Sequence, residues 1–150
     1  MNNHQNPPHP HRRPYFTFLS QVNMHTEAKG FDDAKLTFPI LFARGSDRLS
    51  DIDTVRVKIL AEYLSLNPKL LVNLAGHTDP KGTDEYNNVL SLERAKCIQT
   101  ELSRLGVDES RITYNGHGSD FSIATIRDYD AYHFERRVDV EMIHQSRKPR

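Results

Sequence analysis

The 150-residue sequence lacks several features that mark specialised classes of protein. Cys97 is its one cysteine, so no disulfide can form within the chain, and cysteine usage does not indicate a redox compartment. Lys+Arg and Asp+Glu both number 20, so no net charge directs the protein toward nucleic acid or an anionic membrane. No apolar run approaches the ~20 residues that a membrane-spanning helix needs.

The N-terminal segment also lacks a visible signal peptide, because no apolar core of ~7–15 residues follows its arginines. Either the protein is not exported by that route, or the export segment lies outside this sequence. Prolines and asparagines break up regular structure here, so we predict a disordered or loosely attached tail at residues 1–33 that could add an edge strand. One domain is expected at residues 34–145, followed by a basic tail at residues 146–150.

Hydrophobic periodicity predicts the order of the elements in this domain. A first strand alternates apolar residues from Leu36 to Phe42, and a helix follows to about Leu66. The apolar side of this helix is assigned to five residues spaced by three and four: Ile52, Val55, Ile59, Tyr63 and Leu66.

Three more strands and another long helix complete the pattern. A strand at 70–75 is apolar enough to lie inside a sheet, and a helix at 84–105 ends at Gly106. A strand at 111–115, a loop or short helix and a half-exposed strand at 138–142 follow. The fold class is therefore α/β, an α+β sandwich ordered β-α-β-α-β-(α)-β, with a mixed four-stranded sheet and helices on one face.

Arg94 is the first candidate functional residue. It lies between Leu90 and Ile98 on the apolar stripe of the second helix, with Asn87 two turns earlier on the same side. An arginine is almost never fully buried unless it is paired, so Arg94 needs an anion. That anion could be a carboxylate of the protein or of a ligand, unless the side chain instead extends to water.

Asp79 is the second candidate, because it follows a strand in the segment Gly76-His77-Thr78-Asp79. Ligand sites in open α/β sheets gather beyond the carboxyl ends of strands. An Asp before Pro80 is also common turn chemistry, so this motif alone is weak. Together Asp79 and Arg94 would suit a ligand that carries both an ammonium and a carboxylate.

These residues belong to a longer pattern that resembles a known family. The pattern consists of GHTD at 76–79, Gly82, NxxLSxxRA at 87–95, Leu102 and Gly106, together with FARGSDRL at 42–49, GHG at 116–118 and RRV at 136–138. In order and spacing it closely resembles the OmpA-like C-terminal domain, found in the peptidoglycan-associated lipoprotein and in flagellar stator proteins. The resemblance covers roughly residues 35–144.

The resemblance implies a non-catalytic function: non-covalent binding of the peptidoglycan stem peptide, which anchors an envelope protein or structure to the cell wall. By matching position, Asp79 would take the side-chain ammonium of diaminopimelate and Arg94 its carboxylate. Asn87 and Arg136 would hydrogen-bond the ligand, or Asp79 and Arg94, while Thr78 and Phe42 would line the groove.

The same resemblance implies a location and partners, and it leaves two departures to explain. The protein would lie in the periplasm or cell envelope, with envelope proteins or a second copy as further partners and with no cofactor. Glu135 replaces the family's asparagine before the arginine pair, where it could divert Arg136 into a local ion pair and weaken its contact with the ligand. The loop at 119–126 lacks the proline that is common there.

Two other functions remain open from the residues. His77, Asp79, His117 and His133 could converge as ligands of a catalytic metal, although no HExxH motif is present. The chain could also be an OmpA-like structural or protein-interaction module that does not bind peptidoglycan.

Overall fold

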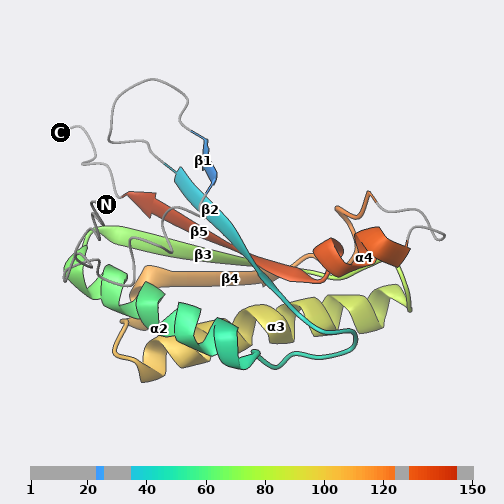
Figure 1. Ribbon diagram of the computed structural model, residues 1–150, viewed down its shortest axis with the longest axis horizontal. Helices are drawn as coiled ribbons and strands as arrows, with labels where there is room; N and C mark the ends of the chain where they lie inside the picture. Colours follow the sequence, from blue (N-terminus) through green and yellow to red (C-terminus); the bar gives the residue numbers. More distant parts are fainter. Residues whose placement is uncertain (1–22, 26–34, 124–128, 145–150) are drawn as a thin grey trace, which may run out of the picture.

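The computed structural model describes residues 23–25, 35–123 and 129–144 (Figure 1). Its elements, in chain order, are β1 (Asn23–His25), β2 (Lys35–Leu41), α2 (Asp51–Leu66), β3 (Leu70–His77), α3 (Asp84–Arg104), the 3₁₀ turn η2 (Glu109–Arg111), β4 (Ile112–Gly116), α4 (Tyr129–Glu135) and β5 (Arg137–His144). The expected tails therefore lie outside the described residues, except for 23–25. None of the helices in these described ranges is long and apolar enough to cross a membrane.

The strands form one mixed sheet in the order β1-β2-β5-β3-β4. β3 and β4 are parallel and are joined through α3, whereas the other neighbours are antiparallel. The predicted α+β sandwich is confirmed, and β3 lies inside the sheet as expected. The sheet has five strands rather than four, because the three residues of β1 pair with the free edge of β2.

Alternation along the strands determines which face of the sheet is covered. In β3 and β5 the even-numbered residues through Met142 are buried, while the odd-numbered residues at 71–75 and 137–141 are only partly covered. The buried set packs against α2 and α3, which lie on the same side of the sheet in Figure 1. The sandwich thus has two layers, and its core lies between the helices and one face of the sheet.

The ends of α2 are fixed by polar contacts. At its N-terminus, Ser50 Oγ accepts a hydrogen bond from Asp53 N at 3.1 Å and donates one to Asp53 Oδ2 at 2.8 Å. At the other end, the Arg111 guanidinium donates to the carbonyls of Leu64 and Asn67 at 3.0 and 2.8 Å. Arg111 therefore satisfies carbonyls that the end of a helix leaves without partners.

The buried face of α2 differs from the prediction. The residues that enter the core are Val57, Leu60, Ala61 and Leu64, whereas Ile52, Val55 and Leu66 are exposed and Ile59 and Tyr63 are half-buried. Both sets have helical spacing, so periodicity alone could not choose between them. Packing against the sheet buries Val57, Leu60, Ala61 and Leu64. The prediction was wrong for Ile52, Val55 and Leu66, whereas Ile59 and Tyr63 pack against the core while staying half-buried.

Candidate functional site

The site forms where α3 approaches the ends of β3 and β4. Gly76 and Gly116 are register partners in these strands, and a Cβ on either glycine would collide with Ser91. Ser91 is fully buried, and its Oγ accepts a hydrogen bond from Gly118 N at 2.8 Å. Because Asn87 and Arg94 flank Ser91 by about one turn on the same side of the helix, this close packing places both side chains beyond the strand ends.

The Arg94 guanidinium is fully buried and is held by backbone oxygens from two loops. Nε donates to Ser46 O at 2.8 Å, Nη1 to His77 O at 3.0 Å and Nη2 to Ala43 O at 3.2 Å. Among the described residues it has no ion pair with a carboxylate. Burial lowers the pKa of Arg94 to about 10, and the nearby Asp79 charge opposes that shift, so the side chain stays protonated at neutral pH.

Asp79 lies at the other side of the same cavity and is buried as well. Its Oδ1 accepts from Lys81 N at 3.0 Å, and its Oδ2 lies 3.4 Å from Arg136 Nη1. Arg136 is positioned in turn by Phe42, whose carbonyl accepts from its Nε at 3.3 Å. The expected contact between Asp79 and Arg136 is thus present, whereas Asp79 and Arg94 are not directly paired.

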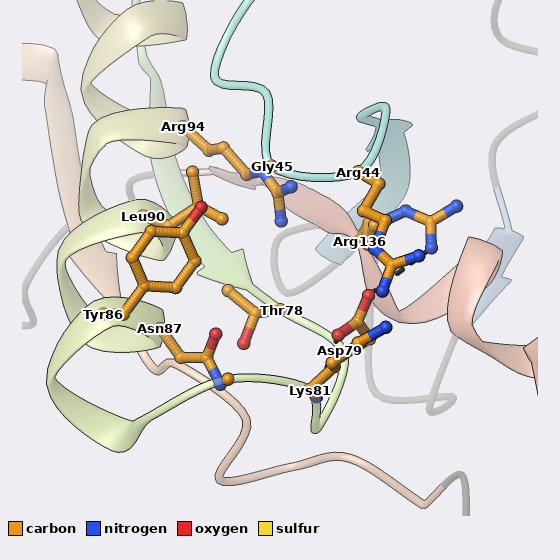
Figure 2. A pocket seen from close by; sticks show the side chains of 11 residues that line it. Arg44, Gly45, Thr78, Asp79, Lys81, Tyr86, Asn87, Leu90, Arg94 and Arg136 are labelled. Carbon is orange, nitrogen blue, oxygen red and sulfur yellow. Dashed lines mark hydrogen bonds and ion pairs between the residues drawn. The ribbon is translucent and has the colours of Figure 1, made fainter. Parts of the chain in front are cut away.

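These side chains line a cavity of about 210 Å³ (Figure 2). Tyr86, Asn87 and Arg94 extend into it from α3, with Thr78 between them and Asp79. Thr78 Oγ1 and Asn87 Nδ2 are buried and have no hydrogen-bond partner among the residues that the structure describes. Buried polar groups are rarely left unsatisfied, so both atoms are available to a polar group that enters the cavity, whether water or ligand.

The charge balance of the cavity is strongly one-sided. Asp79 is the only carboxylate among the lining residues, which carry four cationic side chains: Arg44, Lys81, Arg94 and Arg136. A ligand with net negative charge would therefore fit better than a neutral one.

Five of the six predicted site residues line this cavity, namely Thr78, Asp79, Asn87, Arg94 and Arg136. Phe42 does not. It belongs to the core, and its ring lies under Arg94, with 5.4 Å from the guanidinium carbon to the ring centroid. Phe42 therefore does not line the groove, contrary to the expectation from the sequence.

Sequence reasoning missed other lining residues, which are Arg44, Gly45, Lys81, Gly82, Tyr86 and Leu90. Arg44 and Gly45 lie within the strand-exit motif at 42–49, and Tyr86 lies one position before Asn87. Gly45, Gly82 and Leu90 are themselves motif positions, whereas for Arg44, Lys81 and Tyr86 proximity to such positions was the only signal in the sequence.

Glu135 does not divert Arg136 into a local ion pair. Its Oε2 lies 3.6 Å from Arg137 Nη1, and its Oε1 accepts from Ile123 N at 3.0 Å. Arg136 extends toward Asp79 instead. The substitution at 135 therefore leaves the Asp79–Arg136 contact in place, because the Glu135 carboxylate is held by Arg137 and by Ile123 N instead.

The residues proposed as metal ligands separate into different environments. His77 and His117 stack with ring centroids 5.3 Å apart, and His77 Nε2 lies 3.4 Å from Asp139 Oδ2. Asp79 contacts Arg136 rather than these rings. In the described ranges no three His, Cys, Asp or Glu side chains gather as a metal site would require.

Comparison with known proteins places this geometry in context. The profile of the OmpA family matches residues 41–131, which is more than half of the chain. Outer membrane porin F of Pseudomonas fluorescens is 37% identical over 86 residues, which are 57% of this chain and 26% of the porin. The peptidoglycan-associated lipoprotein of Pseudomonas aeruginosa is 37% identical over 70 residues, which are 47% of this chain and 42% of the lipoprotein.

A solved structure agrees with these sequence matches. The crystal structure of the peptidoglycan-associated lipoprotein from Burkholderia pseudomallei superposes with a TM-score of 0.66 at 28% identity, covering 69% of this chain and 88% of that one. The matched segment spans about a quarter of the porin and less than half of the Pseudomonas aeruginosa lipoprotein. By its fold, its motif spacing and these matches, the chain belongs to the OmpA family, a family of non-enzymatic domains in bacterial envelope proteins.

Proposed function

We propose that this domain binds peptidoglycan without chemical reaction and anchors an envelope protein or structure to the cell wall. The ligand group is the diaminopimelate of the stem peptide, whose side chain ends in an ammonium and a carboxylate. The observation that carries the proposal is the buried, protonated Arg94, which has no carboxylate partner in the described part of the chain and shares a cavity with Asp79. The site thus offers one group of each sign to the ligand.

The roles follow from the contacts. The two guanidinium N–H groups of Arg94 that no carbonyl occupies would donate to the ligand carboxylate. Asp79 would accept from the ammonium while Arg136 and Lys81 N hold it in place. Thr78 Oγ1 and Asn87 Nδ2 would gain the partners they lack.

The surplus positive charge supports a peptide ligand rather than an isolated amino acid. Arg44 and Lys81 are exposed at the cavity that Asp79 and Arg94 also line, and they can contact a further carboxylate of the stem peptide. The names of the relatives, a peptidoglycan-associated lipoprotein and an outer membrane porin, support a location in the cell envelope.

A co-sedimentation assay with purified sacculi containing diaminopimelate tests this proposal. We expect the wild-type chain to pellet with sacculi and Asp79→Asn to lose at least about tenfold in affinity, since a buried charge loses its partner. Asn can still accept from Lys81 N, so the loop should keep its shape. Asp120→Asn changes an exposed carboxylate outside the cavity and should bind normally.

A pair of stem peptides tests the role of Arg94 separately. Diaminopimelate and lysine differ by the side-chain carboxylate, so wild type should prefer the diaminopimelate peptide in calorimetric titration. Arg94→Lys should lose that preference because an ammonium cannot donate as a bidentate fork, whereas Arg104→Lys on the exposed end of α3 should retain it. Wild-type protein that ignores both sacculi and peptides would instead favour a protein-interaction module.

A further inference from the structure

The outer side of α2 carries an apolar stripe that the core covers only in part, through Ile59 and Tyr63. Ile52, Val55 and Leu66 are 74%, 54% and 53% exposed, and Ile59 and Tyr63 are half-buried between them. None of these residues lines the cavity described above. Contiguous exposed apolar side chains at helical spacing are typical of a contact surface for another helix.

The spacing within the stripe indicates what that other helix is. From Ile52 to Leu66 the intervals are three, four, four and three, which read the same in both directions from Ile59. Two copies of α2 placed antiparallel about a two-fold axis at Ile59 would therefore set Ile52 against Leu66 and Val55 against Tyr63. Such self-complementarity is the requirement of a two-fold interface, in which one surface meets itself.

The charges beside the stripe fit the same arrangement. Lys58 and Glu62 are exposed and lie one turn apart on one flank of the helix. In the antiparallel pair Lys58 of one copy lies near Glu62 of the other, and Asp51 lies near Lys69, which follows the helix. A parallel pair would place this flank of each helix against the opposite flank of the other, so neither of these charge pairs could form.

We propose that α2 is a dimer interface, in which it packs antiparallel on α2 of a second copy of this chain around Ile59. Because α2 contributes nothing to the ligand cavity, both cavities stay open in the dimer. If the proposed function holds, the dimer would attach to a polymeric wall at two points and gain avidity. The interface itself does not depend on that function.

The oligomeric state of the full chain, measured by sedimentation equilibrium over a concentration series, gives the first test. We expect a monomer–dimer equilibrium that Ile52→Glu or Val55→Glu weakens at least about tenfold, as for truncation of an interface anchor. Val89→Glu, at an equally exposed apolar position on α3, should leave it unchanged. A chain that stays monomeric at all concentrations would overturn the proposal, as would equal weakening by Val89→Glu.

Charge exchange and cross-linking test the orientation. Lys58→Glu should weaken the dimer, and Lys58→Glu combined with Glu62→Lys should restore it.

Cross-linking gives a second test of the orientation. Ile52→Cys chains and Leu66→Cys chains, both in a Cys97→Ser background, are mixed and oxidised. The mixed disulfide-linked dimer, identified by its mass, should form in larger amount than either self-linked dimer. Preferential self-linking would indicate a parallel pair and contradict the proposal. A monomer that loses thermal stability with Ile52→Glu would assign the stripe to another segment of the same chain, which also contradicts it.

Discussion

Arg94 combines two properties that rarely occur together in one residue: complete burial and no carboxylate partner among the described residues. Three backbone carbonyls orient it but supply only partial negative charge. An uncompensated buried charge costs stability, so the domain retains an unfavourable group that an anionic ligand group would relieve. This is the pattern expected of a binding residue rather than of a structural salt bridge.

Asp139 gives a test of pH-dependent stability at the scale of one residue. Burial favours its neutral form, yet its contacts with His77 and Arg137 hold the pKa of Asp139 below its ordinary value of 3.8. The carboxylate therefore stabilises the fold above pH 3.8, and this stabilisation is lost as the pH falls from there through the lower folded-state pKa. Removing this carboxylate should therefore reduce the loss of stability on acidification.

The measurement is the free energy of urea unfolding between about pH 6 and pH 2.5. Asp139→Asn should be less stable than wild type at neutral pH and should lose less stability on acidification. Asp120→Asn, an exposed carboxylate, should follow the wild-type curve. An acid dependence of Asp139→Asn that matches wild type would contradict the assignment.

At the scale of the elements, the close packing of α3 against Gly76 of β3 and Gly116 of β4 determines where the site residues of α3 lie. Gly76→Ala would place a Cβ against the backbone of Ser91, which cannot move unless α3 moves. We expect the free energy of unfolding to fall by about 1–3 kcal/mol, as in overpacked cores. Ligand affinity should fall as well, because Asn87 and Arg94 would shift with the helix.

Gly106→Ala is the matched control for this prediction. Gly106 has open space around it but a φ of +96°, so its substitution strains the C-terminal end of α3 far from the cavity. It should lower stability by about 1 kcal/mol and leave binding intact. If Gly76→Ala lowers stability but binds like Gly106→Ala, the close approach at Gly76 is not what positions the site.

At the scale of the whole molecule, the core of the described residues begins at β2. The buried and partly buried apolar residues that form it extend from Leu36 to Met142. β1 adds three cross-strand pairs at the edge of the sheet. A chain of residues 35–150 should therefore fold and keep its ligand affinity, losing up to about 2 kcal/mol of unfolding free energy from edge pairing.

This prediction also tests the expected division of the chain into a tail and a single domain. Thermal unfolding and co-sedimentation of the shortened chain beside the full one give the two readouts. Cooperative unfolding with wild-type affinity is expected. A chain that fails to fold without residues 1–34 would show that the expected tail belongs to the domain.

Much of the fold and most of the site could be predicted from local patterns. Strand alternation placed β2, β3 and β5, and helical spacing put Arg94 on the buried side of α3. Spacing could not identify the buried face of α2, because two apolar sets share the same period. Nor could it show that Arg136 pairs with Asp79, since this contact joins segments far apart in sequence.

The sequence by itself determined the order of the elements and singled out Asp79 and Arg94 as candidates for one site, because periodicity and motif spacing are local properties. Only the tertiary structure decided that backbone carbonyls hold Arg94, that Phe42 supports it from the core, and that Ile52 and Val55 face outward. The physical reason is that burial depends on which surfaces the sheet can cover, and that is settled only when distant segments pack together.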